Sequence, residues 1–214
     1  IPEGTLSPIE LECFGEITAL LHEHSAHYRP AEKIIRPVWG WDRLFGESSF
    51  FNTKYRLRLP SDEIRRLEQV GRIIENRLKD LNMSDYGLIH ADLHRGNLII
   101  QEDQLGIIDF DDCGWGYYLF DVATLLSSIY RLSKDERNYH ILKDAYLKGY
   151  DRIRALPSAI DQELLPFFVM RDMLIVNFIL RSENQEVWHW GGDRVKGIIR
   201  EMRNFIESGT YIGV

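Results

Sequence analysis

The sequence predicts an α+β fold that is mainly α-helical and built around a small β-hairpin. Three observations support this prediction. Apolar residues recur at helical spacing through most of the 214 residues. Between residues 85 and 125 this spacing gives way to short apolar runs that are typical of strands. Polar and charged residues gather where those runs end, so we expect the chemistry of the protein at the small sheet.

Composition and charge are those of one globular domain or one large lobe. Hydrophobic residues make up 44% of the chain, enough to bury one substantial core. The net charge of −7 argues against a nucleic-acid partner, which requires a basic face. Two cysteines, Cys13 and Cys113, are too few for a disulfide framework and fit a reducing compartment. Pro166 and charged residues interrupt the most apolar run, 164–180, which favours a buried helix over a membrane span. We therefore expect a cytoplasmic protein.

Residues 1–84 are predicted to form two helices separated by an aromatic loop. Ser7-Pro8-Ile9-Glu10 is a helix start, because Ser can cap, Pro suits the first helical position and Glu10 completes a capping box. Prolines and glycines break the segment 29–59. Its aromatic residues favour a loop that packs down, and they are Trp39, Trp41, Phe45, Phe50 and Phe51. A second helix begins at Ser61, with an apolar face that reaches Leu81.

Strand-like runs then begin at Gly87, Leu98 and Leu105. The last two are separated by a polar turn, which predicts a hairpin over 98–109. Four helices are predicted to follow, at roughly 121–131, 135–155, 160–182 and 194–208.

The residues that carry chemistry lie at the ends of these runs. Residues 90–97 read His-Ala-Asp-Leu-His-Arg-Gly-Asn, and residues 108–112 read Ile-Asp-Phe-Asp-Asp. An Asp, an Asn five residues later and a carboxylate ending a strand form the set that phosphoryl transfer from ATP requires. One group handles the proton of the acceptor, and two more hold the metal ions. Singly, each residue is more often a cap or turn residue, but together they indicate a site.

This pattern resembles the protein-kinase-like fold, and more closely the aminoglycoside phosphotransferase/choline kinase family. In that family a His-Gly-Asp-Leu-His-x-Gly-Asn loop precedes an Ile-Asp-Phe-Asp/Glu segment, and Ala91 here replaces the usual Gly. A looser likeness continues through residues 116–123. The resemblance implies that Asp92 is the catalytic base or orients the acceptor hydroxyl. It implies that Asn97 and Asp109 coordinate the Mg²⁺ ions that bridge the phosphates of ATP.

The same resemblance implies supporting roles for neighbouring residues. His94 stands where protein kinases have a Lys, so it either bonds a phosphate oxygen or orients Asp92. Asp111 is a candidate auxiliary metal ligand. The ring of His90 would pin the loop against the metal-binding segment. Asp121 reads as a helix N-cap that would also accept backbone N–H bonds from the expected catalytic loop, residues 90–97.

One rival interpretation starts from the same residues. His90-x-Asp92-x-His94 alone could ligate Zn²⁺ or Mn²⁺ in a metallohydrolase. A two-metal phosphoesterase needs further ligand clusters, and the remaining histidines show no such context. Asn97 and Asp109 would also have no role, so this interpretation is the weaker one.

The parts that hold ATP in a kinase-like enzyme are missing from these residues. We find no Gly-x-Gly-x-x-Gly loop, and Lys33 and Lys54 look like surface lysines rather than the strand Lys of such enzymes. The chain therefore resembles the large C-terminal lobe alone, with the N-terminal ATP lobe absent and left to a full-length protein. We expect the isolated chain to bind nucleotide weakly.

Within such a lobe, residues 1–84 would supply helices and the aromatic loop, 85–125 the catalytic loop and metal-binding segment, and 126–214 the helical substrate-binding part. The aromatic loop and the last helices would line the acceptor pocket. Candidates to stack on an acceptor or attract its amine are Trp39, Trp41, Trp188, Trp190, Glu183, Glu186 and Asp193, although packing and solvated roles are open for each.

The sequence thus predicts an ATP- and Mg²⁺-dependent phosphotransferase. It would transfer the γ-phosphoryl group to a hydroxyl of a small aminoglycoside-, choline- or homoserine-like molecule, without a nucleic-acid or membrane partner. The alternatives are a Ser/Thr protein kinase of the same superfamily and a non-catalytic remnant that serves as a binding module.

Overall fold

The structure is a computed structural model that describes residues 6–32, 34–47, 49–79, 81, 85–102, 104–133 and 135–214, without the side chains of Trp41 and Phe50. Lys33, one of the two lysines predicted to lie on the surface, lies outside the described residues. The chain forms two compact units. The first contains the described parts of 1–37 and 82–164 together with Gly213, and the second those of 38–81 and 165–212 together with Val214.

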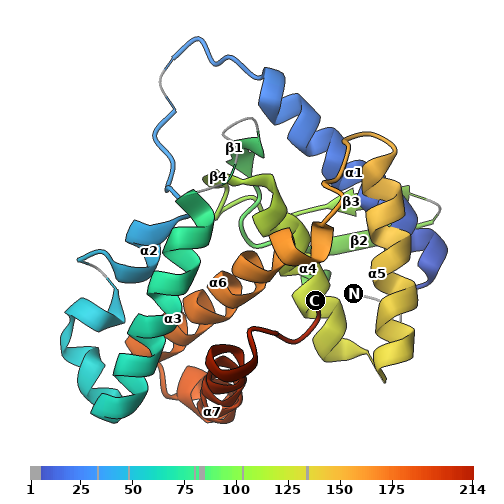
Figure 1. Ribbon diagram of the computed structural model, residues 1–214. Coiled ribbons are helices and arrows are strands. Elements are labelled where there is room, and N and C mark those ends of the chain that lie inside the picture. Colours follow the sequence, from blue (N-terminus) through green and yellow to red (C-terminus); the bar gives the residue numbers. More distant parts are fainter. Residues whose placement is uncertain are drawn as a thin grey trace. The chain divides into compact units, whose positions relative to one another are not determined.

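The first unit contains the small sheets and the helices around them (Figure 1). Its elements are α1 (Pro8–His27), β1 (Tyr86–Ile89), the 3₁₀ turn η4 (Arg95–Asn97), β2 (Leu98–Gln101), β3 (Gln104–Ile107), β4 (Gly114–Tyr117), α4 (Tyr118–Leu132), α5 (Glu136–Asp151) and the start of α6 (Ile160–Arg181). The described elements thus confirm a mainly helical α+β fold.

The start of α1 is confirmed in detail. The backbone N–H of Glu10 donates to Ser7 Oγ at 3.2 Å, and the Ser7 N–H donates to Glu10 Oε2 at 2.6 Å. Pro8 occupies the first turn, where a missing N–H costs nothing. The capping box therefore fixes where α1, the helix that contains His22, begins.

Helices α1 and α5 lie side by side, and two glycines allow their backbones to meet (Figure 1). A Cβ atom on Gly149 would lie 1.8 Å from the carbonyl oxygen of Glu12, and one on Gly15 would lie 2.1 Å from that of Tyr146. At such distances a side chain at either position requires the two backbones to move apart. Lys148 pairs with Glu12 at 2.9 Å beside this crossing.

Two antiparallel strand pairs carry the polar loops. β1 pairs with β4, from Tyr86 opposite Tyr117 to Ile89 opposite Gly114, and β2 pairs with β3 as the predicted hairpin. β4 was not predicted, because Gly114 and Gly116 lower the strand propensity of its sequence. Because Ile89 lies opposite Gly114, the loop that follows β1 and the segment that joins β3 to β4 lie at the same end of the β1–β4 pair.

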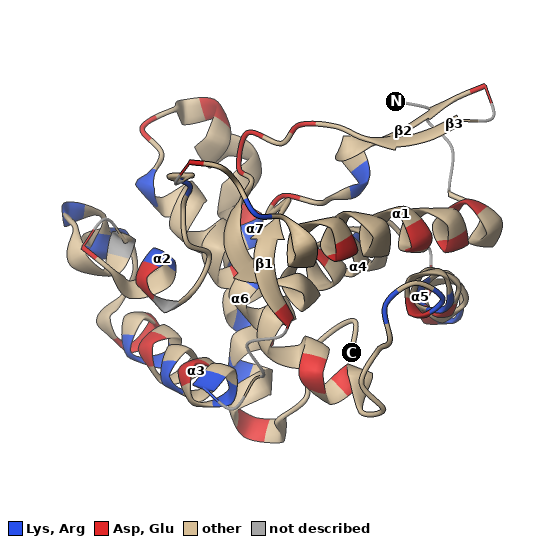
Figure 2. Ribbon diagram, turned by 90° about the horizontal axis from the view of Figure 1, so that it is seen from above, with Lys and Arg blue, Asp and Glu red and all other residues tan. Residues whose placement is uncertain are grey.

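The second unit consists of helices and the aromatic loop. Its elements are α2 (Trp41–Phe45), η1 (Phe50–Asn52), η2 (Lys54–Arg58), α3 (Ser61–Lys79), most of α6, and α7 (Gln185–Ser208). Basic and acidic residues are mixed along α3 (Figure 2). Its buried residues are apolar apart from Glu63. Trp39 and Phe51 are buried, and the rings of Phe45 and Phe51 stack at 4.6 Å, which confirms a loop that packs down.

Two helix starts differ from the prediction. α4 begins at Tyr118, so Asp121 lies inside the helix and is not its N-cap. α7 begins at Gln185 rather than near 194, because Asn184 caps it by accepting from the Glu186 N–H at 2.9 Å. Gly191 is a packing residue within α7, since a Cβ there would lie 2.7 Å from Ile179.

The apolar run in 164–180 forms part of α6, with Pro166 inside the helix. Across the described parts of the chain, each helix is too short or too polar to cross a bilayer.

The glycine crossing predicts opposite effects for two matched substitutions. Gly149→Ala should lower the free energy of unfolding by about 1–3 kcal/mol, because the added methyl group overpacks the α1–α5 contact. Gly197→Ala lies in α7 with open space around it and should raise that energy by about 0.5–1 kcal/mol. Urea unfolding of both variants checks this, and equal stability of Gly149→Ala and wild type would contradict the close approach.

Candidate active site

The loop after β1 is held by one buried carboxylate. Asp121 Oδ2 accepts the N–H of His90 and Asp121 Oδ1 accepts that of Ala91, both at 2.7 Å. Asp121 is only 1% exposed. These bonds hold Ala91 at φ 69°, a left-handed conformation that disfavours residues with a Cβ. The predicted scaffold role of Asp121 is confirmed, and its effect is to set the direction in which Asp92 leaves the strand.

His22 supports the same carboxylate, and sequence reasoning missed it. His22 Nε2 lies 3.2 Å from Asp121 Oδ2, and His22 Nδ1 lies 2.8 Å from the hydroxyl of Tyr150. A ring that donates from Nε2 can accept the Tyr150 O–H at Nδ1. The only indication in the sequence was a His on the buried side of an otherwise ordinary helix.

His90 ties the loop to the segment that carries Asp109. His90 Nε2 donates to the carbonyl of Ile108 at 2.8 Å, and Nδ1 accepts the Asp92 N–H at 3.3 Å. One tautomer satisfies both bonds. The ring also lies 4.7 Å from that of Phe110. The predicted pinning of the loop by His90 is therefore confirmed.

Asn97 makes the second tie between the loop and this segment. Its side-chain Nδ2 donates to the carbonyl of Asp92 at 2.9 Å, and its own carbonyl accepts the Ile108 N–H at 3.0 Å. Because the nitrogen of the amide points to Asp92, the side-chain oxygen of Asn97 is the atom left for a cation. Asn97 is buried, so its orientation is fixed.

His94 faces Asp92. The Gly96 N–H donates to His94 Nδ1 at 2.9 Å, which leaves the proton of the neutral ring on Nε2. His94 Nε2 lies 3.5 Å from Asp92 Oδ2, within ion-pair range but long for a hydrogen bond. Both side chains are partly exposed. Of the two roles predicted for His94, this arrangement favours the orientation of Asp92.

Asp109 and Asp111 project from the segment between β3 and β4. Asp109 has φ 66°, which is uncommon for a residue other than glycine, and it is exposed. Strained backbone of this kind is concentrated at functional sites. Asp111 is also exposed, and its carbonyl accepts from Arg36 Nη1 at 3.1 Å. The structure thus joins Asp92, His94 and Asn97 directly and ties Asp109 to them through its neighbour Ile108.

The donor set fits a hard cation that is held only partly by protein. Within the described residues, no group of three or more His, Cys, Asp and Glu stands close enough to hold a metal ion. An amide oxygen from Asn97 and a carboxylate from Asp109 are nevertheless ligands that Mg²⁺ prefers. Mg²⁺ usually binds through one or two protein groups, with water and phosphate completing its shell. The residues therefore fit magnesium in company with a nucleotide.

Cys113 lies beside this segment. Its N–H donates to the carbonyl of Phe110 at 3.0 Å, and burial raises the pKa of its thiol. A raised pKa leaves the thiol neutral and unreactive near pH 7, as predicted. Both Cys13 and Cys113 are free thiols.

A cleft of about 320 Å³ lies between α1 and β1, lined in part by Leu21, Tyr28, Leu88 and Phe110. It borders the loop after β1 and is lined by His90 and Asp121, but the predicted site residues Asp92, Asp109 and Asp111 do not line it.

Two of the tryptophans predicted to line the acceptor pocket have packing roles in the second unit. Trp39 is buried beneath the guanidinium of Arg43, which lies 4.7 Å from its ring. Trp188 is covered by Arg58 at 4.6 Å, and its indole N–H donates to the carbonyl of Ser182 at 3.0 Å.

Two of the three acidic candidates, Glu183 and Asp193, are paired with neighbouring side chains. Trp190 is 51% exposed. The Tyr55 hydroxyl donates to Glu183 at 2.7 Å, and Lys54 Nζ lies 3.3 Å from the same carboxylate. The hydrogen bond from Tyr55 and, next, that from Lys54 lower the pKa of Glu183. Lys54 is a surface lysine, as predicted. Asp193 pairs with Lys196 at 2.9 Å. Of the tryptophan candidates with described side chains, Trp190 is therefore the exposed one.

Known proteins resemble this chain in sequence. The amicoumacin kinase of Bacillus subtilis (strain 168) is 28% identical over 205 residues, which cover 92% of this chain and 58% of that protein. A homoserine kinase of Granulibacter bethesdensis is 31% identical over 153 residues, or 68% of this chain and 44% of that protein. The chain thus spans about half the length of these relatives.

Solved structures share its fold. A microcompartment-associated aminopropanol kinase matches all of this chain and 67% of its own, with a TM-score of 0.76 and 25% identity. The amicoumacin kinase hAmiN, in complex with AMP-PNP, Ca²⁺ and Ami, matches 94% of this chain and 61% of its own, with a TM-score of 0.72 and 23% identity. The kinase-like fold expected from the catalytic loop is therefore confirmed.

The family profile described as "Phosphotransferase enzyme family" matches residues 7–156, a range that includes α1, both strand pairs, the catalytic loop and Asp121. This chain belongs to the phosphotransferase enzyme family.

Proposed function

We propose that this chain carries the acceptor-activating and metal-binding residues of an ATP- and Mg²⁺-dependent phosphotransferase, which transfers the γ-phosphoryl group to the hydroxyl of a small amino alcohol. The observation that carries the proposal is the arrangement around Asp92. Its carbonyl is bonded by the side chain of Asn97, its carboxylate faces His94, and its N–H is bonded by His90. Two neighbours thus fix the backbone of Asp92, and a third faces its partly exposed carboxylate.

Asp92 is the proposed proton acceptor. The oxygen of the acceptor hydroxyl forms the bond to the γ-phosphorus, and the bond from that phosphorus to the β–γ bridging oxygen breaks, which releases ADP. The hydroxyl proton passes to the carboxylate of Asp92 and then to solvent. His94, with its Nε2 proton toward Asp92, keeps the carboxylate in the rotamer that reaches the hydroxyl. Positioning of this kind supplies most of the catalysis in phosphoryl transfer.

Asn97 and Asp109 would hold the magnesium ions through their side-chain oxygens, with Asp111 as an auxiliary ligand. The bound cation neutralises charge on the phosphates of ATP. His90 and Asn97 keep the two ligand-bearing segments in register through Ile108. In this arrangement, Asp109 sits in a strained conformation where its carboxylate is exposed to a nucleotide.

The acceptor class is supported by the named relatives. Homoserine and aminopropanol, the substrates in two of those names, each carry an amine and a hydroxyl. Relatives named for small molecules also favour this class over the protein-kinase alternative. The excess of acidic residues, 33 against 26 basic ones, suits a cationic acceptor.

A panel of hydroxyl compounds tests the acceptor. The full-length gene product, with ATP and Mg²⁺, should phosphorylate one of 1-amino-2-propanol, homoserine, choline, ethanolamine or an aminoglycoside, as followed by ADP release and ³¹P NMR. The matched N-acetylated amines should be poorer substrates. Phosphorylation of only a Ser/Thr peptide would replace this proposal with a protein kinase, and no transfer at all would favour the non-catalytic module.

Replacing the proposed base should lower turnover without unfolding the protein. In the full-length product, Asp92→Asn should reduce kcat by roughly 10²–10⁴-fold, the range for loss of a positioned general base. Glu102→Gln removes the same charge from an exposed position at the hairpin turn and should leave kcat unchanged. Near wild-type kcat in Asp92→Asn, measured by steady-state kinetics, would refute the role of Asp92.

The strained conformation of Asp109 separates stability from activity. Asp109→Gly and Asp109→Ala both remove the carboxylate, so both should lose Mg²⁺-supported turnover. Gly accepts φ 66° without strain, whereas Ala does not, so Asp109→Gly should be more stable than Asp109→Ala by about 1 kcal/mol. Thermal unfolding and calorimetric titration with MgATP check the pair. Retained MgATP binding in both variants would argue against Asp109 as a ligand.

A further inference from the structure

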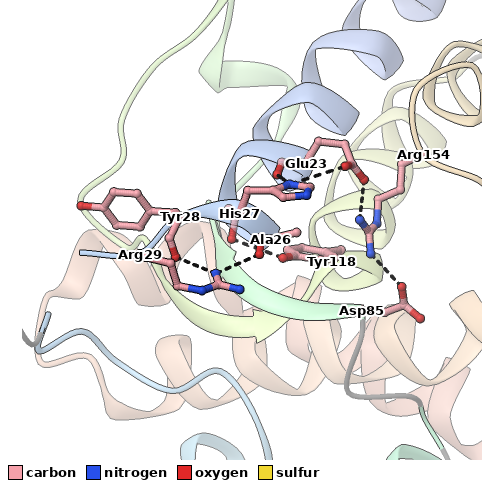
Figure 3. Close-up of polar contacts among 9 residues, drawn as sticks. Glu23, Ala26, His27, Tyr28, Arg29, Asp85, Tyr118 and Arg154 are labelled. Atoms are coloured by element: carbon pink, nitrogen blue, oxygen red, sulfur yellow. Dashed lines mark hydrogen bonds and ion pairs between the residues drawn. The ribbon is translucent and has the colours of Figure 1, made fainter. Parts of the chain in front are cut away.

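Arg154 joins three elements of the first unit at one point. It follows α5, and its Nη1 donates to Glu23 Oε1 at 2.6 Å while Nη2 donates to Asp85 Oδ1 at 2.9 Å. The guanidinium also lies over the ring of Tyr118, 4.6 Å from its centroid. Figure 3 shows Arg154 between the two carboxylates, with Tyr118 beside it. One side chain therefore contacts α1, the residue before β1, and the first residue of α4.

Each of these three elements holds the catalytic loop. Glu23 is adjacent to His22 on α1, and His22 bonds Asp121. Asp85 directly precedes β1, the strand that runs into His90. Tyr118 opens α4, which carries Asp121 in its first turn. A change in the relative positions of α1, β1 and α4 would therefore move the support of the loop.

A continuous series of side-chain contacts also leads from Arg154 to the loop. The ring of Tyr118 stacks on that of His22 at 4.6 Å, with 23° between the planes. His22 donates to Asp121, and Asp121 accepts the N–H groups of His90 and Ala91. Arg154 is thus connected to the backbone next to Asp92 through Tyr118, His22 and Asp121.

Arg154 is largely buried, and its charge is held there by two carboxylates. Its side chain is only 16% exposed. Burial acts to lower the pKa of the guanidinium, but the hydrogen bonds to Asp85 and Glu23 outweigh burial and raise it. Arginine stays charged in any case. Removing this cation would leave Glu23 and Asp85, whose side chains are 34% and 51% exposed, without their shared partner, and the ion pairs that join α1 to the residue before β1 would be lost.

Arg152, two residues earlier, provides a natural comparison. It also reaches α1 from the end of α5, where it pairs with Glu12 and Glu16. Its side chain is 49% exposed, and the two carboxylates that it pairs with both lie on α1, about two to three turns before His22. Arg152 therefore ties α5 to α1 without joining β1 or α4 through these pairs.

We propose that Arg154 is a positioning residue for phosphoryl transfer, which acts through Tyr118, His22 and Asp121 to keep the catalytic loop in place. This inference rests on the proposed function for its effect on the reaction. The positioning itself is a property of the structure and can be measured without any substrate.

The kinetic test compares matched variants of the full-length product. Arg154→Met keeps the apolar stem over Tyr118 and removes the charge, and it should lower kcat by about ten- to a hundredfold, because misplacement of a reacting group by about 1 Å has effects of that size. The KM for ATP should change little. Arg154→Lys should recover part of the loss, and Arg152→Met should keep wild-type kcat.

Amide hydrogen exchange measures the loop independently of activity. The N–H groups of His90 and Ala91 should exchange faster in Arg154→Met than in Arg152→Met, at a temperature where both are folded. If Arg154→Met does not fold, Asp85→Asn removes one arm of the cluster. It should change exchange and kcat in the same direction by a smaller amount.

Each outcome decides the proposal. Equal kcat and equal exchange in the two arginine variants would overturn it, as would a fall in kcat without faster exchange, or faster exchange with unchanged kcat. If the wild-type protein transfers phosphate to no acceptor, the proposed function fails. In that case the exchange of His90 and Ala91 alone decides whether Arg154 positions the loop.

Discussion

The carboxylate of Asp121 is the interaction on which the rest of the site depends. It is buried, so its charge must be satisfied within the protein. Two backbone N–H groups of the loop and the imidazole of His22 satisfy it. Hydrogen bonds to a charged group stabilise by about 1.5–3 kcal/mol each. That is enough to offset the roughly 1–2 kcal/mol that a left-handed Ala91 costs. The carboxylate thus selects an otherwise unfavourable loop conformation.

The residues around Asp92 divide structural and chemical duties. His90 uses both ring nitrogens for backbone groups, so none is left for substrate. Asn97 uses its side-chain nitrogen for the Asp92 carbonyl, which leaves its side-chain oxygen as the atom for the proposed cation. The bonds from His90 and Asn97 to this segment go to the backbone of Ile108, the residue before Asp109. In the proposed function the nucleotide completes the metal shell, and such a site needs ligand groups that are rigidly supported.

Local patterns explain which features could be predicted from the sequence. The cap at Ser7 and the residues from Asp92 to Asn97 each depend on neighbours a few positions away, so spacing alone reveals them. The pairing of His22 with Asp121 and that of Arg154 with Asp85 join residues 99 and 69 positions apart, and no local pattern records them. β4 and the early start of α7 were missed because glycine lowers local propensity, whereas packing decides those segments.

The backbone contact between α1 and α5 has a consequence for how this chain acquires its structure. The ion pair of Lys148 with Glu12, beside that crossing, joins residues 136 positions apart. Contacts over such separations form late, because closing long loops is entropically unfavourable. Along the chain α1 precedes α5 by more than a hundred residues, so the face of α1 around Gly15 stays uncovered until the backbone near Tyr146 is in place. His22 likewise gains the Tyr150 hydroxyl as a partner only when α5 has packed on α1. The support of the loop after β1 is therefore complete only once α1 and α5 have met.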